Sequence, residues 1–231
     1  MPSVPGYILA HTDDTIYVNL FVDSTANISL GRNVIRVVQQ TEYPWDGKVR
    51  ITVQPEKATA FSVCVRIPGW ARNEPVPSDL YSFFRKSGEM WTLKVNGAML
   101  VPNTERGYVR IQRRWKSGDI IELNFPMSVR RVIAHRSVEA DSGKVASQRG
   151  PLVYAFEAID NGGSVLGRIL SDDLDFEKEF HTDLLGGVNI LKSATVQNGL
   201  MAIPYYAWYH RGVGEMAVWL PRHMKHRSAY N

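Results

Sequence analysis

The stretch YVRIQRRWKSGDIIELNF, residues 108–125, contains two runs in which apolar and polar residues alternate. In 108–115 and 119–125 the apolar positions are mostly β-branched or aromatic, which is typical of strands with one buried face. The residues Lys-Ser-Gly-Asp (116–119) between them supply a Ser-Gly pair of the kind used in tight reversals. The stretch therefore predicts two half-buried antiparallel strands joined by a turn.

The same period of two recurs along most of the chain. Further alternating runs occupy 15–22, 49–54 and 61–67, and turn residues fall at 44–48, 95–98 and 141–144. Strands spaced about ten residues apart with such turns favour β-sandwiches. Helical periodicity is weak everywhere, and the best candidate, 172–185, predicts one or two short turns. The sequence thus predicts an all-β fold.

A change of pattern near residue 128 divides the 231 residues into two halves of ordinary domain size. One run of strands ends at NFPMSVRR (124–131), and another begins at KVASQRGPLVYAFEAID (144–160). We predict two consecutive antiparallel β-sandwich domains, jelly-roll-like, over 1–128 and 129–231. No Pro/Gly/Ser-rich linker separates them, so we expect them to pack together. Residues 72–90 are interpreted as a long loop inserted between strands.

Composition excludes several classes of protein. Hydrophobic residues make up 44% and charged residues 22% of the chain, as in soluble globular proteins. No apolar run approaches the roughly 18 residues of a membrane helix. The first residues show no signal peptide, so an isolated gene product is expected in the cytoplasm. The net charge of +4 comes from scattered Lys and Arg, which argues against a nucleic-acid surface.

Few residues offer chemistry. Cys64 is the single cysteine, so neither an intrachain disulfide nor a multi-cysteine metal site is possible. It falls in mid-strand without a neighbouring histidine, and we interpret it as structural. His223 and His226 alone approach metal-ligand spacing, and two ligands make no site. The acids of 172–179 are interpreted as a solvated face. We therefore predict neither catalytic nor metal-binding residues.

Aromatic residues are the remaining candidates for a binding role. Tyr43 and Trp45 lie in the turn EYPWD (42–46), where exposed rings stack on sugars and buried rings fill a core; both interpretations stay open. Trp70 and Tyr81 are further candidates for sugar stacking. The dense cluster in AIPYYAWYHRGVGEMAVWLP (202–221) is apolar on both faces, which predicts a strand covered on both sides that returns after 210–215 as a buried hairpin.

Several strings together resemble one known family. They share their order along the chain and are GYILAHTDDTIYVNLFV, TEYPWDGKVRITV, RIPGWA, VNG, GYVRIQRRWKSGDIIELNFPM, ASQRGPLVYAFEAID, LLGGVNIL and AIPYYAWYHRGVGEMAVWLP. Over residues 6–221 the chain resembles the C-terminal portion of glycoside hydrolase family 127, the β-L-arabinofuranosidase family. The segment 72–90 is longer than the family pattern, and the tail after Pro221 has no counterpart in it.

The resemblance implies that the chemistry of the family lies outside this sequence. It implies an N-terminal (α/α)6 barrel in which a zinc-bound cysteine is the nucleophile and a glutamate the acid/base, with further cysteines and a glutamate on the metal. Those groups precede the region matched here, and residues 1–14 are expected to be a remnant of the link to the barrel. Cys64 matches none of them. No catalytic residue is therefore carried over, and zinc is expected only in the catalytic domain.

Three hypotheses follow for function. The chain is the non-catalytic half of a β-L-arabinofuranosidase-like hydrolase, supporting or completing a barrel in cis or in trans during plant-type glycan breakdown. Alternatively, it is an autonomous carbohydrate-binding module for arabinose-containing glycans that uses Tyr43, Trp45 and Trp70. A third hypothesis is a structural or oligomerisation module, which includes a homodimer, because sheet edges and bare faces self-associate.

Overall fold

The computed structural model describes residues 3–101, 103–193 and 199–223. The described chain is built of strands, and none of its helical segments exceeds four residues, which confirms the predicted all-β class. No described helix is long and apolar enough to cross a membrane. The chain forms two compact units: residues 1–72 with 87–127 make the first unit, and residues 73–86 with 128–231 make the second unit.

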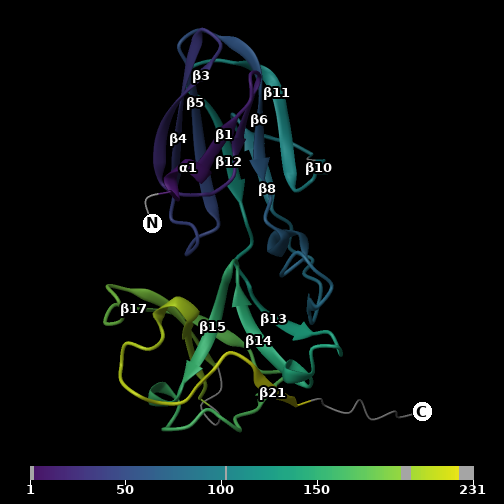
Figure 1. The fold of residues 1–231 in the computed structure, drawn as a ribbon, viewed down its shortest axis with the longest axis vertical. Helices are drawn as coiled ribbons and strands as arrows, with labels where there is room; N and C mark the ends of the chain where they lie inside the picture. Colours follow the sequence, from purple (N-terminus) through teal and green to yellow (C-terminus); the bar gives the residue numbers. More distant parts are fainter. Residues whose placement is uncertain (1–2, 102, 194–198, 224–231) are drawn as a thin grey trace, which may run out of the picture. The chain divides into compact units, whose positions relative to one another are not determined.

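Two sheets make up the first unit (Figure 1). The five-stranded sheet has the order β1 (Leu9–His11), β2 (Thr15–Val18), β6 (Thr59–Arg66), β11 (Tyr108–Trp115) and β10 (Thr104–Glu105). The six-stranded sheet has the order β3 (Ser24–Leu30), β4 (Asn33–Thr41), β5 (Lys48–Pro55), β12 (Asp119–Asn124), β8 (Thr92–Val95) and β9 (Ala98–Met99). A short helix, α1 (Pro5–Ile8), precedes β1. The strand pairs are antiparallel except that β2 runs parallel to β6.

The two strands of the stretch 108–125 are both present, in different sheets. β11 pairs with β6, and β12 pairs with β5 and β8, so the turn 116–119 carries the chain from one sheet to the other. Gly118 has a φ of 91°, a conformation that glycine adopts without steric cost. Asp119 Oδ2 accepts a hydrogen bond from Lys116 N at 2.9 Å, which closes the turn. The pattern was right about the strands, and the turn is a corner of the sandwich.

Rows of apolar side chains across each sheet form the core of the first unit. Ile51 lies opposite Ile121 in one sheet, and Ile16 lies opposite Val63 in the other. All four are at most 1% exposed. Each such side chain contributes about 1.5–3 kcal/mol through burial. This alternation of buried and exposed positions is the period of two that the sequence showed.

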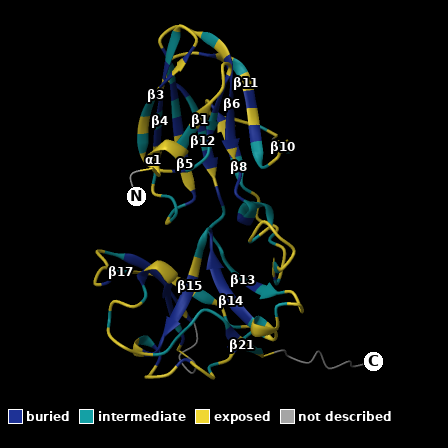
Figure 2. Ribbon diagram, viewed as in Figure 1, coloured by how far each residue is buried: buried dark blue, intermediate teal, exposed yellow. Residues whose placement is uncertain are grey.

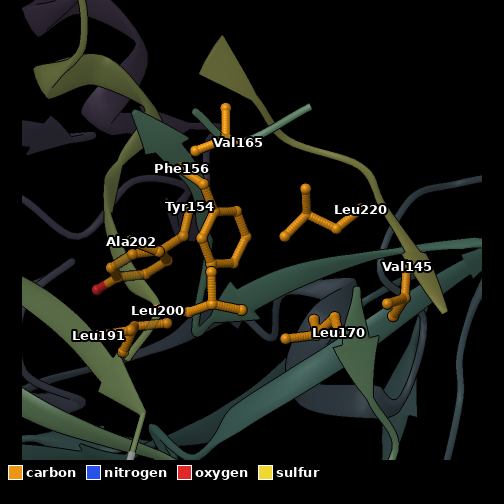
Figure 3. Packing of buried hydrophobic residues seen from close by; sticks show 9 residues of the cluster. All are labelled: Val145, Tyr154, Phe156, Val165, Leu170, Leu191, Leu200, Ala202 and Leu220. Atoms are coloured by element: carbon orange, nitrogen blue, oxygen red, sulfur yellow. The ribbon is translucent and has the colours of Figure 1, made fainter. Parts of the chain in front are cut away.

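The second unit is a single network of ten hydrogen-bonded strands. These are β7 (Tyr81–Phe83), β13 (Val129–Ala134), β14 (Lys144–Arg149), β15 (Leu152–Glu157), β16 (Leu170–Ser171), β17 (Phe176–His181), β18 (Val188–Ser193), β19 (Met201–Pro204), β20 (Met216–Ala217) and β21 (Leu220–His223). Buried residues run along β14 and β15 (Figure 2). Side chains from six of the strands meet in one cluster (Figure 3), so the network folds back on itself around a core.

The segment 72–90 differs from the predicted loop. Its residues 81–83 form β7, which pairs with β13, and Asn73–Lys86 belong to the second unit. Phe83 is buried, and the guanidinium carbon of Arg130 lies 3.4 Å from the centre of its ring. A strand of three residues is too short to show a period, which is why the sequence pattern missed it.

Two further predictions for the second unit are wrong. Residues 176–181 form strand β17 instead of helical turns; β17 pairs with β18 at the edge of the network, where charged residues are typical. The predicted hairpin of 201–210 with 216–220 is also absent. β19 ends at Pro204 and is followed by a 3-10 turn, and both β19 and β20 pair with β15.

Candidate functional site

Two of the four aromatic residues considered for sugar stacking, Tyr43 and Trp70, pack into an aromatic cluster in the first unit. Trp70 is buried, and its indole nitrogen donates a hydrogen bond to Tyr43 Oη at 3.3 Å. The Tyr43 ring lies 5.5 Å from that of Phe21, and the Trp70 ring lies 5.6 Å from that of Phe125. Burial raises the pKa of the Tyr43 hydroxyl. These two rings are held by protein neighbours, so sugar stacking by this cluster stays a prediction that depends mainly on Trp45.

Trp45 lies in a firmly held turn and is 45% exposed. The backbone nitrogens of Trp45 and Asp46 both donate to Glu42 O, at 2.9 and 3.1 Å. Gly47 follows, and a Cβ at this position would lie 2.0 Å from Phe125 O. The turn therefore depends on glycine for its close approach to the backbone of Phe125, and its backbone bonds hold the position of Trp45 in the chain.

Next to this turn, the outer face of the six-stranded sheet is hollowed. Two rows of polar side chains cross the sheet. The first runs over β4, β5, β12 and β8 and consists of Gln40, Arg50, Glu122 and Lys94. The second runs over β5, β12 and β8 and consists of Lys48, Asn124 and Thr92. With Glu42 and Asp46 of the turn, they line a hollow of about 770 Å³, which we call the sheet hollow. Arg50 and Glu122 pair within it at 3.0 Å. Its mixture of donors and acceptors suits a neutral, hydroxyl-rich ligand.

Cys64 lies inside a sheet in the first unit. It is 5% exposed and lies between Tyr17 of β2 and Arg110 of β11. Burial raises the pKa of its thiol, which opposes the thiolate form that attacks or ligates. The described residues contain no group of three His, Cys, Asp or Glu side chains placed to hold a metal ion. His226 lies outside the described residues. The donors among the described residues do not match the sulfur-ligated zinc centre that the resemblance implies for the catalytic domain.

Four of the five acids of 172–179 are exposed, as the predicted solvated face requires, and Asp172 is the exception. Asp172 is mostly buried and accepts two hydrogen bonds from Arg222, at 2.6 and 2.7 Å. These bonds hold the pKa of the Asp172 carboxyl below its usual range. Glu179, in contrast, lies near the surface beside Lys192, at 3.6 Å. Asp172 is therefore a structural ion pair, and the correction arises because Arg222 is fifty residues away in sequence.

The aromatic segment near the C-terminus is exposed, which contradicts the predicted buried hairpin. Tyr205, Tyr206 and Tyr209 are 47%, 45% and 73% exposed. The loop 205–215 that contains them borders a second hollow of about 310 Å³, lined by Trp208, Tyr209, Arg211 and neighbouring residues of 157–163 and 212–215. The glycines Gly212 and Gly214 gave the turn signal on which the predicted reversal at 210–215 was based. The alternation of apolar residues over 201–209 predicted that the strand continues to this reversal, whereas it ends at Pro204.

Two family models match consecutive parts of the chain. The first is described as "Beta-L-arabinofuranosidase, GH127 middle domain" and matches residues 15–127. The second is described as "Glycoside hydrolase family 127 C-terminal domain" and matches residues 129–221. The junction between the two matches coincides with the change of pattern near residue 128.

Similar proteins of known name agree with these matches. A non-reducing end β-L-arabinofuranosidase of Bifidobacterium longum subsp. longum is 34% identical over 95% of this chain, which covers 35% of that protein. The solved structure of a GH127 β-arabinofuranosidase is 36% identical with a TM-score of 0.90, over 96% of this chain and 37% of its own. A GH127 β-L-arabinofuranosidase from Geobacillus stearothermophilus T6 is 36% identical with a TM-score of 0.83, over 96% and 36%. The chain thus spans little more than a third of these relatives.

Proposed function

Because the chain belongs to glycoside hydrolase family 127, of which it holds the middle and C-terminal domains, we propose that it supports the catalytic domain of a β-L-arabinofuranosidase-like hydrolase. One observation supports this role above the others. Nearly the whole chain matches β-L-arabinofuranosidases, and the match covers little more than a third of each of them. In this proposal the chain supports the catalytic domain structurally, and the catalytic residues lie in the remainder of the enzyme.

The residues of this chain favour such a division of roles. A nucleophile must be accessible and easily deprotonated, whereas Cys64 is buried in mid-strand with a raised pKa. Many glycosidases instead use two carboxyl groups facing one substrate bond, and the carboxyl group of Asp172 is already paired with Arg222. In the proposed enzyme, zinc, nucleophile and acid/base belong to the catalytic (α/α)6 barrel, in cis or in trans.

The proposed substrates are arabinose-containing glycans of plant type, by analogy with the names of the relatives. A homodimer and a cytoplasmic location stay predictions.

A chimera tests the supporting role. In it, this chain replaces the matched region of the Bifidobacterium longum enzyme, and hydrolysis of an aryl β-L-arabinofuranoside is measured. We expect activity from the chimera and none above background from this chain alone, with or without zinc. A zinc-dependent rate of the isolated chain that disappears in Cys64→Ser would overturn the proposal, and so would a folded chimera without activity.

The sheet hollow supports a second candidate function, carbohydrate binding. Its two polar rows lie beside the turn that presents Trp45, and aromatic faces stack on sugar rings while polar side chains bind hydroxyls. Calorimetry of the chain with arabinose oligosaccharides should then show binding that Trp45→Ala weakens. Lys94→Ala at the far side of the hollow should weaken it as well. Absence of heat with every glycan tried would remove this candidate.

A further inference from the structure

The loop 205–215 places apolar and aromatic side chains on the surface of the second unit. Val213, at its tip, is fully exposed, Tyr209 is 73% exposed, and Ile159 beside them is 61% exposed. Trp208 lines the same hollow, and its ring lies 5.1 Å from that of Tyr209 and 6.1 Å from that of Tyr205. We call these five residues the apolar tip surface. Exposed apolar groups gathered around one hollow indicate a place that is covered in the functional state.

Buried charges hold this loop in place. Arg211 pairs with both Glu157 and Asp160, and its Nη1 lies 2.7 Å from Asp160 Oδ1. The two carboxylate side chains are about nine-tenths buried. Glu157 Oε1 also accepts a hydrogen bond from Tyr209 N at 3.1 Å. Tyr209 has a φ of 78°, which is unfavourable for a tyrosine and is sustained by these contacts. We call Arg211, Glu157 and Asp160 the Arg211 clasp.

Glu215 fixes the other end of the loop. Its Oε2 accepts hydrogen bonds from Ser164 Oγ at 2.8 Å, from Val165 N at 2.9 Å and from Leu166 N at 3.1 Å. These three donors hold the pKa of the Glu215 carboxyl below its usual range. The charged groups of the loop are therefore engaged with the protein itself. What the loop offers outward is aromatic and aliphatic surface.

This composition favours a protein partner over a sugar. A sugar site needs polar groups that are directed at the ligand, and here the charged groups bind the loop. Tyr, Trp and Arg are enriched at the centres of protein interfaces. The hollow of about 310 Å³ has the size of a pocket for one or two partner side chains.

We infer that the apolar tip surface is a docking surface for the catalytic domain of the family. This inference rests on the proposed function. The chain covers 35% of the Bifidobacterium longum enzyme, so most of that enzyme lies outside the matched region and is available as the partner. A rigid loop with an apolar tip loses little conformational freedom when it is covered, which favours a stable contact.

Two matched substitutions test the inference in the chimera described above. Val213→Asp places a charge on the docking surface, and Val101→Asp places one at an equally exposed position of the first unit, 98% exposed. Both variants of the isolated chain should keep the thermal midpoint of the parent, because neither side chain is buried. In the chimera, Val213→Asp should speed limited proteolysis between the domains at least about tenfold, which is a loss of about 1.4 kcal/mol in docking. Val101→Asp should leave the rate unchanged.

The outcomes separate the two proposals. Equal cleavage rates for the two chimera variants would overturn the docking surface, whatever the activity. A chimera that is resistant to cleavage, sensitive to Val213→Asp and inactive would support docking and overturn the proposed function. Binding of arabinose oligosaccharides to the isolated chain that Val213→Asp abolishes would show a sugar site instead, and would also overturn the docking surface.

Discussion

Replacing Arg211 with alanine should destabilise the second unit strongly. The change leaves the carboxylates of Glu157 and Asp160 in place, with side chains only 10% and 9% exposed, and removes the guanidinium that pairs with both. It also frees Tyr209, whose backbone nitrogen depends on Glu157. Buried carboxylates without a partner are costly because the interior solvates charge poorly.

The structure sets the size of the effect. Removing one partner of a buried ion pair costs about 3–5 kcal/mol. Arg211 itself is 26% exposed, so water reaches part of the site and the lower end applies, about 3 kcal/mol. The surface pair Arg50–Glu122 gives the contrast, since its side chains are 46% and 42% exposed. Arg50→Ala should cost less than about 1 kcal/mol.

Amide hydrogen exchange measures the loss of stability caused by Arg211→Ala and by Arg50→Ala in the strands next to each residue. The amides of residues 152–157 in β15 should exchange roughly a hundredfold faster in Arg211→Ala, since each 1.4 kcal/mol is a factor of ten. In Arg50→Ala the amides of β5 should change less than about fivefold. Adding Glu157→Gln and Asp160→Asn to Arg211→Ala should recover part of the loss, because no buried charge then remains. Equal exchange of β15 in the parent and in Arg211→Ala would contradict the reasoning.

Further predictions concern pH, reactivity and the aromatic cluster. Arg222 lowers the pKa of Asp172, so their pair stabilises the second unit fully above about pH 4, the usual aspartate value, and loses this contribution as the pH falls through the lower folded value. Asp172→Asn should therefore flatten the acid side of a plot of thermal midpoint against pH. Cys64 should react with a thiol reagent at least about tenfold more slowly in the folded than in the unfolded chain. Trp70→Ala should cost about 3–5 kcal/mol in the unfolding free energy of the first unit, and Trp45→Ala less than about 1 kcal/mol, as measured by urea titration.

The strands of the first unit were predictable because their pattern is local. In 49–54 and 119–123 every second residue is buried, and all of these residues except Asp119 are Val, Ile or Leu. A period of two needs no knowledge of the partner strand. Pairing itself was not predictable, since β2 runs parallel to β6 across more than forty residues. β7 pairs with β13 over a similar separation in sequence, and its three residues are too few to show the period of a strand.

The candidate site was less predictable because burial depends on what covers a side chain. The sequence around Tyr43 and Trp70 does not distinguish rings that stack on a sugar from rings that pack on Phe125. Only the fold shows that they pack on Phe125. In 201–209 apolar letters fall on both faces, which predicted a covered strand. The strand instead ends at Pro204, and Tyr209 is exposed. In this loop Arg211 pairs with the carboxylates of Glu157 and Asp160, more than fifty residues earlier in the sequence.

The Arg211 clasp holds a surface loop at a cost in the folding free energy of the second unit. This cost bears on what the loop does. Buried ion pairs can often be replaced by apolar residues with no loss or with a gain of about 1–4 kcal/mol. In the isolated second unit, the clasp adds backbone strain at Tyr209 and leaves the Nε of Arg211 buried without a hydrogen-bond partner among the described residues. It also keeps Val213 in water, where an apolar side chain gains nothing. Docking of the tip, as inferred above, would remove Val213 from water, and a loop already fixed in its docked shape loses less entropy on docking. The clasp therefore supports the inferred docking surface better than it supports a role in the stability of the unit alone.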